Sequence, residues 1–250
     1  MVKVGIIGGS GLDDPRLLKD AKEFHAITPF GETSSPLTVG TIEGREVVIL
    51  ARHGRHHTIP PTQVNYRANI HALKSQNCTH ILATTACGSL REEIKRGDIV
   101  ILDQFIDFTR LRPITFFETF PPGAENAKHT PMADPFSEPL RQKLIAIAKQ
   151  LGLSSHERGT VVTIEGPRFS TRGESRMFRM WGADVINMSL APEVVLANEV
   201  GIPYAAVAIS TDYDCWKTDE APVEWSEVLK IFENNVRNVK NLLLQTIQTL

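Results

Sequence analysis

Two aspartates separated by one residue, Asp212 and Asp214, follow the most apolar strand-like run of the chain, which starts at Pro203. The run is apolar on both faces, as in the central strand of a parallel sheet. Ligands of open α/β sheets bind beyond the carboxyl ends of the strands, where both carboxylates fall. Two acids held close together do not easily both ionise, so we expect one pKa to rise and that acid to become a proton donor. A solvated turn is the alternative, because Asp is common in turns.

Polar residues of another kind stand at or just beyond the ends of four other strand-like runs. They are Ser10, Arg52, His53, Thr85 and Ser189. Hydroxyls, one guanidinium fork and one imidazole form an oxyanion cage for a mobile phosphate. Each segment alone also fits a tight turn or a solvated basic loop. An anion cage together with an acid facing a flat heterocycle predicts cleavage of a glycosidic bond by phosphate.

Two other types of site are disfavoured by spacing. The glycine-rich segment GGSG has Asp14 where a dinucleotide fingerprint has its third glycine, and it lacks the Gly-Lys-Ser/Thr of a P-loop. This argues against a Rossmann dehydrogenase. His53, His56 and His57 have neither a carboxylate nor the spacing of a known metal-ligand set. We therefore expect no metal and no cofactor, with inorganic phosphate as a co-substrate.

Composition sets the class of protein. The 250 residues have a net charge of −2, which gives no indication of a nucleic-acid or anionic-membrane partner. No apolar run is long enough to span a bilayer, and the N-terminus lacks an export signal, so we expect a cytoplasmic location. The three cysteines are widely spaced and are expected to be reduced thiols.

Strand-like runs alternate with amphipathic helices, which predicts a single α/β domain over residues 1–250 with a mixed sheet. An irregular segment at roughly 110–135 is too long for a simple connection, so we expect it to be functional or partner-bound. Expected strands are 4–7, 36–40 and 46–51 as a hairpin, 80–86, 98–108, 159–164, 183–188 and 204–209; expected helices are 61–76, 138–151, 170–181, 192–200 and one from near 223 toward 250.

Six ordered segments, GGSGLD, LARHGRHH, TTACGSLREEI, TIEGPRFS, NMS and TDYDCW, give a more specific indication. With them, nearly the whole chain resembles the trimeric purine nucleoside phosphorylases, and within that family the members that act on 5′-methylthioadenosine. The resemblance implies a single α/β domain with a barrel-like mixed sheet flanked by helices. It also implies a homotrimer or a dimer of trimers.

The implied reaction is phosphorolysis of S-methyl-5′-thioadenosine to adenine and 5-methylthioribose 1-phosphate, with phosphate as the nucleophile and Asp212 as the general acid at purine N7. His129, in the long irregular segment, is implied to reach the 5′-substituent of a ligand in a neighbouring subunit. By the family pattern, Ser10, Arg52, His53, Thr85 and Ser189 hold phosphate, Ala86, Phe169, Met188, Asp212 and Asp214 contact the nucleoside, and Ser170, Val223, Trp225 and Val228 govern specificity.

Departures from the family pattern leave specificity open. Ser10 and Ser189 stand where many relatives have threonine, and Trp225 replaces a smaller aliphatic residue. Adenosine or another 5′-modified adenine nucleoside is therefore an alternative substrate. A phosphorylase for 6-oxopurines is a second alternative, although such relatives usually carry an amide at the position of Asp212. A non-catalytic nucleoside-binding module is disfavoured, because binding alone needs no acid at N7.

Overall fold

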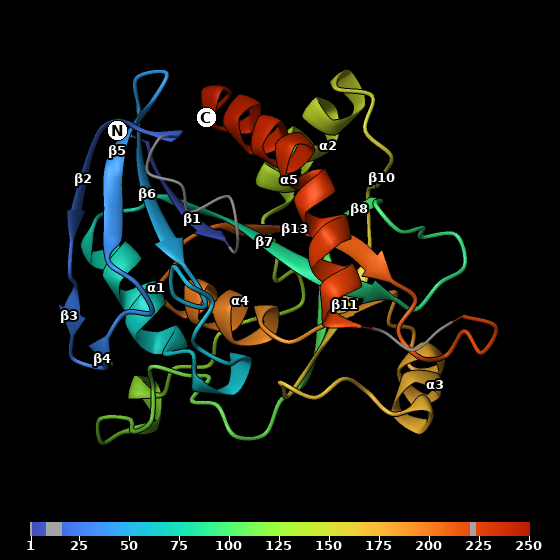
Figure 1. The fold of residues 1–250 in the computed structure, drawn as a ribbon. Helices are drawn as coiled ribbons and strands as arrows, with labels where there is room; N and C mark the ends of the chain where they lie inside the picture. The colour runs from blue at the N-terminus through green and yellow to red at the C-terminus, as the bar shows by residue number, and fades with distance from the viewer. Residues whose placement is uncertain (1, 9–16, 221–223) are drawn as a thin grey trace.

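One mixed sheet runs through the middle of the molecule (Figure 1). The computed structural model describes residues 2–8, 17–220 and 224–250, and within them eleven strands form this sheet. The strands are β1 (Lys3–Gly8), β2 (Lys19–Phe24), β5 (Leu37–Ile42), β6 (Arg45–Ala51), β7 (His80–Ser89), β8 (Ile99–Ile101), β9 (Gln104–Phe108), β10 (Ser155–His156), β11 (Thr160–Ile164), β12 (Val185–Asn187) and β13 (Tyr204–Asp212), while β3 (Ile27–Thr28) and β4 (Gly31–Glu32) form a separate hairpin.

The sheet branches at β7. This strand pairs in parallel with β1 and β13, and its last residues, Gly88 and Ser89, pair antiparallel with β12. The main path runs in the order β10-β8-β13-β7-β1-β6-β5-β2, while β12 continues to β11 and β9. Because this pairing is antiparallel, Val185 lies opposite Ser89, and β12 runs back along β7 so that Asn187 reaches Thr85. The predicted single α/β domain with a mixed central sheet flanked by helices is confirmed.

Helices cover both faces of the sheet (Figure 1). Along β13, Ala206 and Ala208 belong to one core cluster with residues of α1 and α4, and Val207 and Ile209 belong to a second with residues of α2 and α5. Alternate side chains of a strand face opposite sides, so a run apolar throughout is buried on both faces. The helices are α1 (Tyr66–Ser75), α2 (Glu138–Gln150), α3 (Arg172–Met180), α4 (Leu190–Glu199) and α5 (Trp225–Gln248), with short 3-10 turns at Pro61–Gln63 and Ala124–Asn126.

The structure differs from the predicted elements in four places. The predicted helix over 61–76 is a 3-10 turn at Pro61–Gln63 followed by α1 from Tyr66, with Val64 extended between them. The run expected as one strand over 98–108 is two strands, because the chain leaves β13 at Leu102 and pairs with β11 from Gln104. Helix α4 begins at Leu190 rather than at residue 192, since Ser189 is its N-cap. Strand β2 was not predicted, because its sequence KDAKEF is highly charged and mostly exposed. None of the described helices is long and apolar enough to cross a membrane.

Candidate active site

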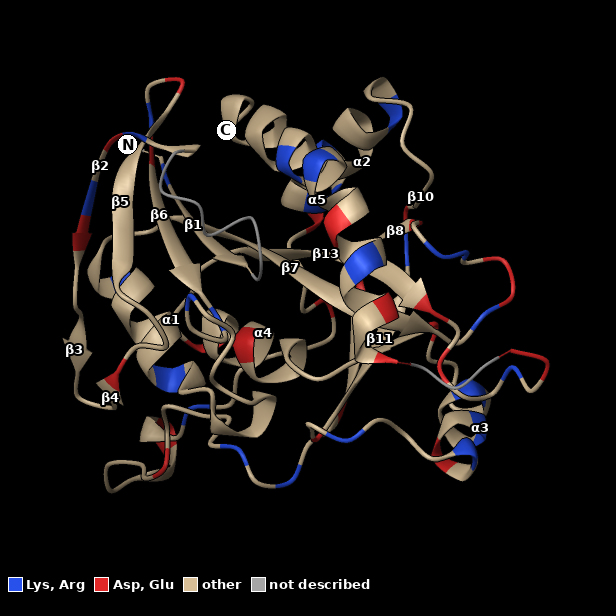
Figure 2. Cartoon of the chain, viewed as in Figure 1, with Lys and Arg blue, Asp and Glu red and all other residues tan. Residues whose placement is uncertain are grey.

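A cavity lies at the carboxyl ends of β6, β7, β12 and β13. Its empty volume, including the open mouth, is about 980 Å³. Strands β7 and β13 carry several of the predicted site residues. Neither strand contains Lys, Arg, Asp or Glu apart from Asp212 at the end of β13, and Figure 2 shows few charged residues at the centre of the sheet. Twelve of the predicted site residues line this one cavity: Arg52, His53, Thr85, Ala86, Phe169, Ser170, Met188, Ser189, Asp212, Asp214, Trp225 and Val228.

Arg52 follows the last residue of β6 and is only 2% exposed. Its Nε and Nη2 donate to the two carboxylate oxygens of Glu193, with an Nη2–Oε2 distance of 2.9 Å, and Nη1 donates to the carbonyl oxygen of Thr84 at 2.8 Å. Glu193 thus engages the Nε–Nη2 edge of the guanidinium, and the expectation that Arg52 holds phosphate stays a prediction. A guanidinium has five N–H donors, so two lie outside these three bonds, and Arg52 also has the Tyr204 hydroxyl as a hydrogen-bond partner.

His53 has a defined proton arrangement. Its Nδ1 lies 2.9 Å from the carbonyl oxygen of Ile59, so Nδ1 is the donor and carries the hydrogen. Burial lowers the pKa of His53 to about 4, and the nearby charge of Arg52 acts in the same direction. The imidazole is therefore neutral at physiological pH and contributes no positive charge to the cavity.

Two hydroxyls meet across the cavity from segments far apart in the chain. The Oγ atoms of Thr85, on β7, and Ser189, at the N-cap of α4, are 3.5 Å apart. The side chain of Ser189 makes no capping hydrogen bond, so its hydroxyl is available to a ligand at the positive end of the helix dipole. Asn187 donates from Nδ2 to the Thr85 hydroxyl at 3.3 Å and fixes its position.

The two aspartates differ in their surroundings. Burial raises the pKa of Asp212 to about 6, with the charge of Asp214 as a smaller cause than the sequence argument supposed. The carboxyl of Asp212 accepts hydrogen bonds from the Thr211 hydroxyl at 2.8 Å and from the Asp214 backbone N–H at 2.7 Å. Asp214 accepts instead from the Ser170 hydroxyl at 2.5 Å. Asp212 is thus the acid that retains a proton closest to neutral pH.

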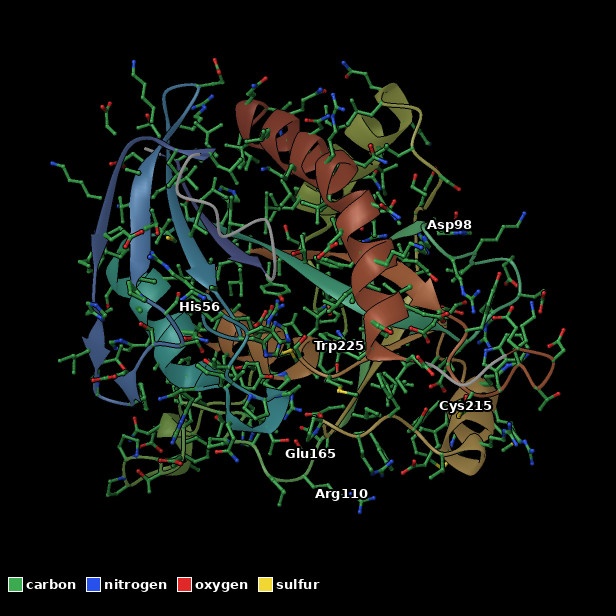
Figure 3. The ribbon with its side chains drawn as sticks, in the orientation of Figure 1. His56, Asp98, Arg110, Glu165, Cys215 and Trp225 are labelled. Atoms are coloured by element: carbon green, nitrogen blue, oxygen red, sulfur yellow. The ribbon has the colours of Figure 1, made fainter. Side chains whose placement is uncertain are left out.

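Apolar groups form the remaining walls. Phe169 is 41% exposed at the cavity, while Val228 is buried. Trp225 is in the first turn of α5, at the end of that helix nearest the centre of the molecule (Figure 3). Gly88 brings the backbone close to the acid, since a Cβ there would lie 2.8 Å from Asp212 Oδ1.

Three predicted residues are not placed in this cavity. Ser10 and Val223 lie outside the described residues. His129 is exposed, makes a ring contact with Phe120 and does not line the cavity of its own chain. Its expected role in a neighbouring subunit stays a prediction.

Comparison with known proteins identifies the family of this fold and site. Residues 3–248 match the family described as the phosphorylase superfamily. The chain belongs to the phosphorylase superfamily. It is 58% identical to S-methyl-5′-thioadenosine phosphorylase of Xenopus tropicalis, over 98% of this chain and 88% of that protein. It is 55% identical to the enzyme of the same name from Danio rerio, with the same shares covered.

Solved structures agree with this membership. The structure of Schistosoma mansoni methylthioadenosine phosphorylase in complex with adenine aligns with a TM-score of 0.93 and 46% identity, over 100% of this chain and 92% of that one. A serine-to-threonine mutant of the S. mansoni adenosine/methylthioadenosine phosphorylase, in complex with methylthioadenosine, aligns with a TM-score of 0.92 and 45% identity, over 100% and 91%.

Sequence reasoning missed three residues of this phosphorylase site. Glu193 is completely buried and holds both Arg52 and the hydroxyl of Tyr204, which donates to Oε2 at 2.8 Å. His57 lines the cavity, with its ring 4.7 Å from that of His53 and 5.5 Å from that of Trp225. Glu193 had one available signal, since a carboxylate within an apolar helical run must be paired when buried.

Arg112 is the third missed residue, and it supports the part of the cavity wall formed by Met188 from behind. Its Nη1 donates to the carbonyl oxygen of Met188 at 2.6 Å and to the Tyr66 hydroxyl at 3.0 Å, and its Nε donates to Glu165 at 2.7 Å. The start of the long irregular segment therefore fixes the backbone that carries Met188 and Ser189. Glu165 and Arg110, whose N–H also bonds to Glu165, are labelled in Figure 3.

Proposed function

We propose that this protein catalyses the phosphorolysis of S-methyl-5′-thioadenosine to adenine and 5-methylthioribose 1-phosphate. One observation carries the proposal: Asp212, a buried carboxyl whose pKa is raised to about 6, lines the same cavity as the guanidinium of Arg52 and the hydroxyl of Ser189. The names of the relatives from X. tropicalis and D. rerio support the choice of nucleoside.

The acid acts at the departing base. As the C1′–N9 bond breaks, electron density moves into the purine and accumulates at N7. Protonated Asp212 donates its proton to N7, which is general acid catalysis. The carbonyl oxygen of the same protonated carboxyl accepts from the exocyclic amine of adenine, because a carboxylic acid offers one donor and further acceptor sites. A 6-oxopurine presents an acceptor there and would lose this bond.

Phosphate acts on the opposite side of the sugar. Arg52 and the hydroxyls of Thr85 and Ser189 orient it beneath C1′, where its charge stabilises the oxocarbenium-like ribosyl group before the new C–O bond forms. Protons balance without a metal or cofactor. Adenine leaves with the proton that Asp212 donated. Hydrogen phosphate brings one proton, which it loses when the product becomes a phosphate monoester dianion, and that proton returns Asp212 to its acid form.

The walls near the 5′ position set a limit on selectivity. Trp225 and Val228 are apolar and suit a methylthio group, but an apolar pocket rejects a hydroxyl by only about 1–3 kcal/mol. The S. mansoni relative is named an adenosine/methylthioadenosine phosphorylase. Adenosine is accordingly proposed as a slower second substrate of this chain.

We also propose that the chain works as a homotrimer in which the 110–135 segment completes a neighbour's site. Three large apolar side chains of this segment are exposed, Leu111 at 74%, Ile114 at 38% and Phe120 at 43%, as is expected of a segment that packs against a partner. His129, exposed on the same segment as Leu111, is the side chain proposed to reach the neighbour's nucleoside. Light scattering coupled to size-exclusion chromatography measures the oligomeric state, and a monomeric active enzyme would contradict this assembly.

The function is tested by following adenine release with and without phosphate. We expect release from S-methyl-5′-thioadenosine to require phosphate and to yield the sugar 1-phosphate; equal rates in phosphate-free buffer would identify a hydrolase instead. Values of kcat/KM are then compared for methylthioadenosine, adenosine, methylthioinosine and inosine. The expected order places both 6-aminopurines above their 6-oxo counterparts, and the reverse order would establish a 6-oxopurine phosphorylase.

A further inference from the structure

The imidazole of His53 faces the phosphate site with an acceptor rather than a donor. Its Nδ1 hydrogen is directed to the carbonyl oxygen of Ile59 at 2.9 Å, and a carbonyl oxygen can only accept. A neutral imidazole has one N–H, so Nε2 carries a lone pair. Among the described residues, no protein group is seen to hydrogen-bond to Nε2, and His53 lines the cavity.

The charges around His53 favour its neutral form. Arg52 precedes it, His57 stacks beside it from the same loop, and Arg112 approaches from the long irregular segment. Each of these groups disfavours a second positive charge, and burial does so more strongly, so the pKa of His53 is lowered to about 4. Two acids pair with the arginines: Arg52 engages both oxygens of Glu193 of α4, and Arg112 donates from Nε to Glu165 at 2.7 Å.

The other members of the site supply donors. Arg52, which lines the cavity, offers only N–H donors, and the hydroxyls of Thr85 and Ser189 can rotate toward an anion. A fully deprotonated tetrahedral dianion would satisfy these donors but would place an oxygen lone pair against the lone pair of His53 Nε2. An anion that retains one hydroxyl satisfies both kinds of partner, because its hydroxyl can donate to Nε2 while its other oxygens accept.

We propose that His53 Nε2 accepts a hydrogen bond from the P–OH group of the hydrogen phosphate dianion, which makes the site selective for singly protonated tetrahedral dianions over sulfate. This inference rests on the proposed function, since it concerns the phosphate of that reaction. Hydrogen phosphate, hydrogen arsenate and sulfate carry the same charge at pH 8, and only sulfate lacks the hydroxyl. His53 is thereby a residue that selects the protonation state of the nucleophile.

The test is calorimetric titration of the intact protein with phosphate, arsenate and sulfate at pH 8, in two buffers that differ in their enthalpy of ionisation. We expect phosphate and arsenate to bind alike and without net proton uptake. Sulfate should bind roughly 10- to 100-fold more weakly, because it leaves a buried acceptor unpaired or forces protonation of His53. Its residual binding should take up close to one proton and should strengthen as the pH is lowered.

Two variants separate the roles in the site. His53→Gln presents an amide that can rotate to donate, so the preference for phosphate over sulfate should fall toward onefold. Ser189→Ala is the matched control, because it removes a donor used by all three anions and should weaken the binding of each anion equally, without changing the preference for phosphate over sulfate.

Equal binding of sulfate and phosphate to the unmodified protein, or proton uptake on binding phosphate, would overturn the inference while leaving phosphorolysis intact. If no anion binds and adenine release is independent of phosphate, the proposed function fails together with it.

Discussion

The substitution Asp212→Asn should make the protein less active and more stable at the same time. Burial raises the pKa of this carboxyl from an ordinary 3.8 to about 6, and that difference corresponds to about 3 kcal/mol. A folded-state pKa that is raised means the acid stabilises the fold while protonated and loses that contribution as the pH rises through about 6. At pH 8 the folded protein therefore carries an unfavourable buried charge, which asparagine removes.

The site can accommodate the amide. Its oxygen can accept from the backbone N–H of Asp214, as Oδ1 of Asp212 does at 2.7 Å. Its NH₂ group can donate to the Thr211 hydroxyl. The hydrogen of that hydroxyl is then directed to the carbonyl oxygen of Cys87, 3.1 Å away, instead of to the carboxyl. The introduced asparagine would then keep one N–H directed into the cavity, so it can bind a purine but cannot transfer a proton to N7.

Two assays check this prediction. Unfolding in urea, at one fixed protein concentration, should show Asp212→Asn to be more stable by up to about 3 kcal/mol at pH 8, with about half of that gain left at pH 5. At saturating phosphate, kcat/KM for methylthioadenosine should fall about 10²- to 10⁴-fold. For the unmodified protein we expect kcat/KM to fall as the pH rises above about 6, and this fall should be absent in Asp212→Asn. The loss of kcat/KM for methylthioinosine should be smaller than the loss for methylthioadenosine.

Asp214→Asn is the matched control, since it leaves the acid at residue 212 and should retain the pH dependence near 6. Equal unfolding free energies of Asp212→Asn and the unmodified protein at pH 8 would refute the argument from burial. A uniform loss on 6-amino and 6-oxo substrates would refute the assignment of this carboxyl as the reader of the adenine amine.

Three further substitutions test other parts of the site. Glu193→Gln leaves the buried guanidinium of Arg52 without a counter-charge, so we expect a loss of about 3–5 kcal/mol in urea unfolding and a higher KM for phosphate; unchanged values would show that the pair is dispensable. Gly88→Ala places a Cβ 2.8 Å from Oδ1 of the general acid and should lower kcat/KM about 10- to 100-fold, whereas Gly173→Ala, with no contact closer than 3.8 Å, should leave it unaltered. His129→Ala should raise KM for methylthioadenosine without changing that for phosphate, and identical kinetics would argue against a shared site.

Sequence reasoning from strand position selected residues that the structure brings into one cavity. Arg52 directly follows β6 and Asp212 is the last residue of β13, and strand ends of one sheet gather at one edge; Thr85 lines the same cavity from within β7, which continues to Ser89. The same reasoning fails for residues on helices or in loops, whose direction depends on packing. Glu193 lies in the first turn of α4 and is held by a residue 141 positions away, a contact that no local pattern encodes.

The sequence by itself determined the fold class, the approximate positions of most strands and the inventory of donors and acids, because apolar periodicity and residue chemistry are local properties of the chain. Only the tertiary structure decided how those groups are used. Packing of α4 against the sheet places Glu193 on Arg52, and burial raises the pKa of Asp212 above that of an exposed acid. The carbonyl of Ile59 fixes which nitrogen of His53 faces the anion. Protonation states and hydrogen-bond directions depend on desolvation and on partners distant in sequence, and these exist only once the chain has folded.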